Sequence, residues 1–91
     1  MLNRSDIASV TVKAITEILE EEGEKPSRIS GGDSLTGLGV SSLVFARVAI
    51  ELEDELGVDP FKEGLEGEVS VQTVDDLIDA YENALAKSGA Q

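Results

Sequence analysis

The sequence predicts a single all-α domain over residues 1–91: a small four-helix bundle with three main helices, a short third helix and a long first loop. Three observations favour this fold. The chain is too short for two domains of ordinary size. Three segments without Gly or Pro carry apolar residues at helical spacing, and none alternates like a β-strand. Aromatic residues make up only 3% of the chain, so the core is mainly aliphatic, which suits packed helices.

Residues 5–22 predict the first helix, because their apolar side chains fill one arc of a helical wheel and their polar side chains the other. Asn3 or Ser5 can act as its N-cap, and Gly23 is expected to end it. A long connection follows over residues 23–41, and connections of this length are often functional. Its apolar residues are expected to hold it against the helices; they are Ile29, Leu35, Leu38 and Val40.

Residues 42–56 predict the second helix, which Gly57 ends. Its core face carries Phe45, Val48, Ala49, Leu52 and Leu56. Residues 58–70 are broken by Pro60 and two glycines, so at most one helical turn is expected there. Ser70 is expected to cap the last helix, which ends near Ser88. The inner stripe of this helix is Val71, Val74, Leu77, Ile78, Tyr81 and Leu85.

Composition argues against several classes of function. A formal net charge of −12 without a basic patch argues against binding to nucleic acids or anionic membranes. The absence of Cys and His removes thiol catalysis, a serine–histidine pair and the usual zinc ligands, so neither an enzyme nor a metal site is expected. No segment resembles a signal peptide or a membrane span, and a cysteine-free chain fits the reducing cytoplasm.

The outer face of the second helix carries a second stripe, formed by Leu43, Arg47, Ile50 and Asp54 and flanked by Val44. Two aliphatic side chains aligned on a face opposite the core predict a docking surface for partner proteins. The alternative is that the long first loop covers them. An acidic cluster, which includes Glu51, lies at the end of the same helix; it is either a solvated face or a target for basic patches.

The start of this helix is the second candidate site. Ser41 and Ser42 lie at its first positions, where free backbone N–H groups and the positive end of the helix dipole favour a bound or attached phosphate. Taken alone, however, either serine can simply be the N-cap of the helix.

Residues 33–43, Asp-Ser-Leu-Thr-Gly-Leu-Gly-Val-Ser-Ser-Leu, resemble the acyl and peptidyl carrier proteins. The pattern of that family is D-x-L-x-x-L-G-x-D-S-L, running into helix two. The resemblance extends to the first helix, the long loop, the acidic residues 51–57 and residues 71–77. It implies that Ser42 carries a covalent 4′-phosphopantetheine arm. Ser41 and Ser34 are the alternative positions for the arm.

Two features qualify the motif. The usual Asp before the modified serine is Ser41 here, and Val44 and Arg47 stand where fatty-acid carriers often have acidic residues. A literal Asp-Ser-Leu also occurs at residues 33–35, but the two glycines that follow cannot open a stable helix. Ser42 is instead followed by an uninterrupted amphipathic run, so the register favours Ser42.

The resemblance implies a freestanding, monomeric carrier that holds acyl or aminoacyl intermediates as thioesters and catalyses nothing itself. Its pathway would be polyketide, nonribosomal-peptide or fatty-acid-like biosynthesis. Its partners would be a phosphopantetheinyl transferase and the enzymes that load and condense the cargo. The predicted docking residues are Leu43, Val44, Arg47, Ile50, Glu51 and Asp54. The alternative is an unmodified helical interaction module that uses the same outer face.

The charge predicts a salt effect on stability. Because like charges on a small bundle repel one another, we expect the melting temperature at neutral pH to rise with added salt, which screens them. Mild acidification is expected to stabilise the fold as well, since it removes negative charge. Thermal melts followed by circular dichroism measure both effects. A melting temperature indifferent to salt would mean that the charges are already paired or lie too far apart.

Overall fold

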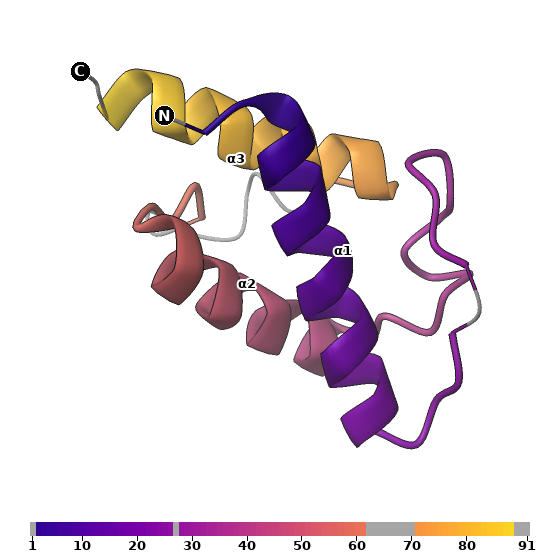
Figure 1. Ribbon diagram of the computed structural model, residues 1–91. Helices are drawn as coiled ribbons and strands as arrows, with labels where there is room; N and C mark the ends of the chain where they lie inside the picture. The colour runs from indigo at the N-terminus through magenta and orange to yellow at the C-terminus, as the bar shows by residue number, and fades with distance from the viewer. Residues whose placement is uncertain (1, 27, 62–70, 89–91) are drawn as a thin grey trace.

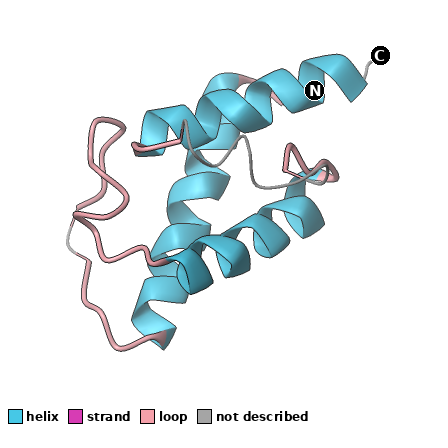
Figure 2. Cartoon of the chain, turned by 180° about the vertical axis from the view of Figure 1, so that it is seen from behind, coloured by secondary structure: helices cyan, strands magenta, loops and turns pink. Residues whose placement is uncertain are grey.

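The computed structural model describes residues 2–26, 28–61 and 71–88. Over these ranges the chain forms three helices, α1 (Arg4–Glu21), α2 (Ser42–Leu56) and α3 (Val74–Ser88). α1 packs against both other helices and crosses in front of them in Figure 1. The described part of the chain contains no strand (Figure 2), and the prediction of an all-α fold is confirmed. Most of the segment expected to hold a short third helix, residues 62–70, lies outside the described residues.

The ends of α1 and α2 follow their local sequence. Asn3 is the N-cap of α1: its side chain accepts a hydrogen bond from the backbone N–H of Asp6 at 2.9 Å, and the Asp6 carboxylate accepts one from the N–H of Asn3 at 3.1 Å. α2 begins at Ser42 and ends at Leu56, as predicted. Gly57 follows with φ of 80°, a left-handed conformation that glycine adopts without a steric cost.

The start of α3 differs from the prediction. The helix begins at Val74 rather than at residue 71, and its first turn is capped by Thr73 and not by Ser70, which lies outside the described residues. The Thr73 hydroxyl accepts a hydrogen bond from the N–H of Asp76 at 3.1 Å. The Asp76 carboxylate accepts hydrogen bonds from the N–H groups of Gln72 and Thr73, and these bonds lower the pKa of Asp76. Val71 has the spacing of an inner residue of the helix, but this reciprocal cap sets the start of α3 at Val74 instead.

The long connection between α1 and α2 is held to the start of α3. Figures 1 and 2 show it running along one side of the bundle, past the first turn of α3. Ser34 and Thr73 form an isolated antiparallel bridge, in which the Leu35 N–H donates to the Gln72 carbonyl oxygen at 2.9 Å. Leu35 and Val40 are buried, and Ile29 and Leu38 pack partly against the core, so the predicted anchoring is confirmed.

Gly31 lies close to the start of α3. The Asp75 N–H donates to the carbonyl oxygen of Gly31 at 2.9 Å, and a β-carbon at position 31 would collide with the Asp75 carboxylate. A residue with a side chain at this position would require the exposed Asp75 carboxylate to move away.

The three aromatic residues link the elements around the core. Phe61, which follows α2, packs edge-to-face against Phe45 of α2, with ring centroids 5.3 Å apart, and against Tyr81 of α3 at 6.1 Å. Such pairs contribute about 0.5–1.5 kcal/mol each beyond the area they bury. The Tyr81 hydroxyl donates to the Ala49 carbonyl oxygen at 3.4 Å, and burial raises the pKa of Tyr81. α2 and α3 are thus joined through this aromatic row.

Near the N-terminus, the side chain of Arg4 connects the first turn of α1 to α3. Its guanidinium lies 2.6 Å from the Asp79 carboxylate and 2.7 Å from that of Glu82. These hydrogen bonds raise the pKa of Arg4. The groups are largely exposed, so they orient the two helices more than they stabilise them.

The Thr73 cap can be tested by mutation. We expect Thr73→Ala to lower the free energy of unfolding by about 1 kcal/mol, as the loss of an N-cap usually does, measured by urea denaturation.

The cap also predicts a pH effect, because the pKa of Asp76 is lower in the folded protein than in the unfolded chain. The Asp76 carboxylate stabilises the fold fully at pH values above its pKa in the unfolded chain. This stabilisation is lost as the pH falls through its pKa in the folded protein. That loss begins at lower pH than the mild acidification expected to stabilise the fold.

Ser9→Ala is the control, since it removes an exposed α1 hydroxyl that makes no hydrogen bond to the described residues. It should not destabilise the protein. Equal stability of Thr73→Ala and the parent chain would show that the cap contributes nothing.

Candidate functional site

Two adjacent serines at the start of α2 have different hydrogen-bonding environments. Ser41 is the N-cap: its hydroxyl oxygen accepts from the backbone N–H of Val44 at 3.2 Å, and its carbonyl oxygen accepts from the N–H of Phe45 at 2.8 Å. Ser42 is the first helical residue and is exposed. Its hydroxyl makes no hydrogen bond to the residues that the structure describes. The structure therefore assigns capping to Ser41 and leaves the Ser42 hydroxyl accessible at the positive end of the helix dipole.

Ser34, the serine of the upstream Asp-Ser-Leu, is engaged elsewhere. Its hydroxyl is 3.0 Å from that of Thr36 and accepts a hydrogen bond from the N–H of Gly37 at 3.2 Å. Its backbone forms the bridge to Thr73. Ser34 thus stabilises a turn in the long loop and does not begin a helix.

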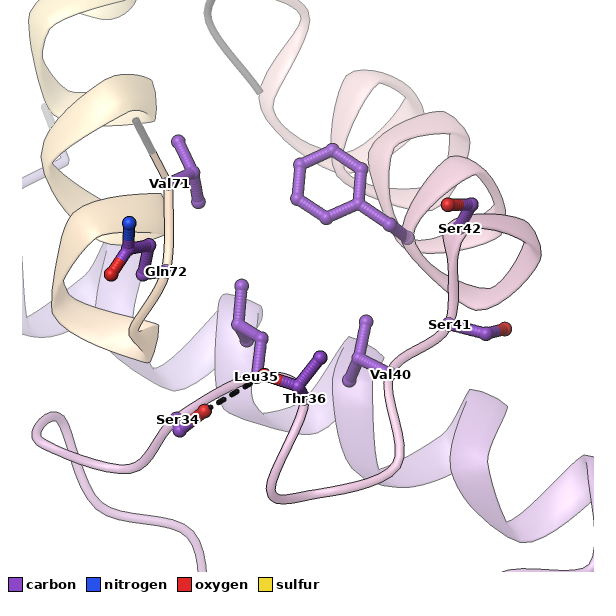
Figure 3. Close-up of a pocket in the computed structure, with 9 residues that line it drawn as sticks. Ser34, Leu35, Thr36, Val40, Ser41, Ser42, Val71 and Gln72 are labelled. Carbon is purple, nitrogen blue, oxygen red and sulfur yellow. Dashed lines mark hydrogen bonds between the residues drawn. The ribbon is translucent and has the colours of Figure 1, made fainter. Parts of the chain in front are cut away.

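A hollow of about 510 Å³ opens beside Ser42 (Figure 3). The long loop forms one wall, the start of α2 a second and the segment before α3 a third. Its apolar lining is Leu35, Val40, Phe45 and Val71, and its polar lining is Ser34, Thr36, Ser41, Ser42 and Gln72. Figure 3 shows Ser41 and Ser42 on the side opposite Val71 and Gln72. The sequence suggested a functional loop, but only the tertiary structure brings residues 71–72 to the same hollow.

The outer face of α2 exposes two large aliphatic side chains. Leu43 is 65% exposed and Ile50 is 67% exposed. The long loop therefore does not cover them, and the alternative interpretation that it does is wrong. Of the acidic docking candidates on this helix, Asp54 is exposed and Glu51 is half-buried.

Val44 is a correction to the predicted surface. Its side chain is only 4% exposed and belongs to the core, so it does not flank the exposed stripe. The reason is helical geometry: Val44 lies one turn before Val48 and two before Leu52, both of which are buried. This spacing in the sequence already indicated an inward orientation.

Arg47 is half-buried and bound to the end of α1. Its guanidinium pairs with the carboxylates of Glu21 and of Glu22, the latter at 2.7 Å, and these hydrogen bonds raise its pKa. Arg47 thus links α2 to the C-terminal end of α1. No feature of the sequence indicated this pairing, because the partners lie more than twenty positions away; a contribution of Arg47 to docking stays a prediction.

A model of a protein family described as the phosphopantetheine attachment site matches residues 13–80. The match includes the long loop, both serines at the start of α2, all of α2 and the beginning of α3. Comparisons with curated proteins and with solved structures found no match. The matched region covers most of the chain and supports a carrier role with a covalently attached 4′-phosphopantetheine. The helical fold, the accessible serine and this match together show that the chain belongs to the phosphopantetheine attachment-site family.

Proposed function

We propose that this chain carries acyl or aminoacyl groups on a 4′-phosphopantetheine arm attached to Ser42. The observation that carries the assignment is the division of roles at the start of α2: Ser41 caps the helix, while the Ser42 hydroxyl is exposed and makes no bond to the described residues. The terminal thiol of the arm supplies the thioester chemistry, which fits a chain without cysteine.

The start of α2 fits a phosphodiester on Ser42. The first backbone N–H groups of a helix have no partner within it, and together with the helix dipole they favour negative charge. No acidic side chain stands in the first turn of α2 to oppose that charge. The hollow beside Ser42 offers space for part of an arm, and its lining combines hydroxyl and amide groups with apolar side chains.

Ser41 in place of an aspartate retains the capping function, because serine and aspartate are comparably good N-caps. It removes a negative charge beside the modified serine. We therefore expect the difference to affect recognition by the transferase that installs the arm and not the folding of α2.

The proposed partners are a phosphopantetheinyl transferase and the enzymes that load and condense the cargo. They would dock on the outer face of α2, through Leu43 and Ile50 and the acidic Glu51 and Asp54. We propose a polyketide, nonribosomal-peptide or fatty-acid-like pathway. The protein would hold the cargo and catalyse no reaction itself.

The second candidate is an unmodified interaction module. The observation that favours it is the same exposed pair, Leu43 and Ile50, which could bind one partner protein without any prosthetic group. The two functions differ in one measurable respect, the covalent modification of Ser42.

We expect coexpression with a broad-specificity phosphopantetheinyl transferase to add one phosphopantetheinyl group, with peptide mapping placing it on Ser42. Intact mass measures the addition. Ser42→Ala should abolish it, while Ser34→Ala should retain it, since Ser34 only stabilises a turn. Modification that survives Ser42→Ala but disappears in Ser34→Ala would overturn the assignment, and no modification of the parent chain would favour the interaction module.

The exposed side chain of Ile50 allows the proposed docking surface to be tested. Because its side chain is largely exposed, Ile50→Asp should change the free energy of unfolding by less than about 1 kcal/mol. The same variant should be loaded more slowly by a partner enzyme, since an unpaired carboxylate at an interface is costly to bury. Urea denaturation and the loading rate are measured on one sample. Ser9→Asp adds the same charge at an exposed α1 position outside the α2 stripe and is the control; equal effects of both variants would contradict a docking role for Ile50.

A further inference from the structure

Three backbone hydrogen bonds join the long loop to the start of α3. Each links an N–H group to a carbonyl oxygen on the other segment, at 2.9 to 3.1 Å; they run from Leu35 to Gln72, from Val74 to Asp33 and from Asp75 to Gly31. Donors stand on both sides, so neither segment can move away without breaking bonds of the other. We call the two segments joined in this way, residues 31–40 and 72–75, the strap.

The strap also reaches the start of α2, through Leu35. The N–H of Leu35 is bonded to Gln72, and its carbonyl oxygen accepts a hydrogen bond from the N–H of Val40 at 2.9 Å. Val40 is buried and directly precedes Ser41, the N-cap of α2. In Figure 3, Leu35 and Val40 lie between the segment before α3 and the start of α2. The described parts of α2 and α3 pack mainly on α1 and little on one another, so the strap is a direct connection between the starts of these two helices.

The strap has fewer buried contacts than the helices that it joins. Leu35 is the only buried residue between positions 31 and 39, and Val74 is the only one between positions 72 and 75. The remaining residues at these positions are half-buried or exposed. Segments with few buried apolar contacts and backbone hydrogen bonds near the surface open at a lower free energy than the core does. The strap is therefore expected to open before the helices unfold.

α3 is held to the bundle by contacts that lie beyond the strap. Leu77 is buried in the core, and the Tyr81 hydroxyl donates to the Ala49 carbonyl oxygen of α2. Arg4 of α1 pairs with Asp79 at 2.6 Å, one turn after the end of the strap. These contacts do not depend on the long loop, so α3 can stay packed while the strap is open.

We propose that the strap opens and closes as one cooperative unit while α1, α2 and the rest of α3 stay folded. Opening breaks the bonds between the long loop and residues 72–75 and releases Val40 from Leu35. It also separates residues 71–72 from the loop, and these residues form one wall of the hollow beside Ser42. The strap thus sets whether Ser42 lies beside a hollow or beside an open surface. This inference goes beyond the proposed function, because it concerns the chain itself and holds with or without an arm on Ser42.

Native-state hydrogen exchange, followed by NMR on the full unmodified chain, tests this unit. We expect the amides of Leu35, Val40 and Asp75 to have protection factors equal within about twofold, and at least about tenfold below those of Val48 in α2 and Tyr81 in α3. The opening of the strap should depend only weakly on added urea, since it exposes little surface.

The amide of Val40 is the decisive probe, because its hydrogen-bond acceptor lies within the loop. Fraying of α3 alone would expose the amide of Asp75 and leave Val40 protected. That result would overturn the proposal, as would exchange of the strap amides only through global unfolding, or no protection of these amides at all.

Two matched cap variants separate the strap from overall stability. Thr73→Ala removes the hydroxyl that caps α3, and Asn3→Ala removes the side chain that caps α1, outside the strap. Thr73→Ala should lower the protection factor of Val40 about fivefold, the size of a lost N-cap, although the two positions lie on different segments. Asn3→Ala should change the protection factor of Val40 by less than about twofold, because α1 stays folded when the strap opens.

The coupling should also act in the opposite direction. Ser34→Ala removes the hydroxyl that accepts from the N–H of Gly37 and loosens the loop side of the strap. It should lower the protection factor of Asp75, in the first turn of α3, by at least about twofold. Equal effects of the two cap variants on Val40, or an unchanged Asp75 in Ser34→Ala, would overturn the proposal. Circular dichroism checks that each variant is folded, and the outcome does not depend on the mass measurement at Ser42.

Discussion

The attachment of the long loop to the start of α3 determines where the start of α2 lies. Residues 23–41 could take many paths between two helices, and closing such a loop costs entropy. The antiparallel bridge at Ser34 and Thr73, the close approach of Gly31 to Asp75 and the burial of Leu35 and Val40 restrict this path. The end of the loop is thereby held beside residues 71–72, and the hollow next to Ser42 is a consequence of that arrangement.

Three serines within nine residues show how local structure differentiates chemically identical side chains. Ser34 accepts a hydrogen bond from a turn N–H, and Ser41 accepts one from the first turn of α2, so both hydroxyl groups stabilise the backbone. Ser42, one residue further on, projects from the helix and makes no hydrogen bond to the described residues. A hydroxyl that stabilises no backbone can be modified without loss of structure. The family match supports a phosphopantetheine arm on this domain, and the hydrogen bonds favour the proposal that Ser42 carries it.

The chain has few basic side chains, and two of them form ion pairs between helices. Arg4 and Arg47 both join elements that are distant in the chain: Arg4 joins α1 to α3, and Arg47 joins α2 to the end of α1. Exposed ion pairs contribute little to stability, so their main effect is on orientation and on the distribution of charge. The positive charge of Arg47 is therefore already paired within the fold, with Glu21 and Glu22.

The sequence by itself determined the helices and the position of the candidate serine. Helix periodicity, the N-cap residues Asn3 and Ser41 and the helix-ending Gly57 act within a few residues, so the limits of α2 could be predicted to the residue. The start of α3 was misplaced because a reciprocal cap at Thr73 and Asp76 competes with apolar spacing, and Val44 was misplaced although its spacing from Val48 pointed inward. Only the tertiary structure decided the pairing of Arg47 with α1, the bridge to Thr73 and the hollow beside Ser42. These contacts join residues far apart in the chain, and their geometry depends on how whole helices pack, which no local pattern encodes.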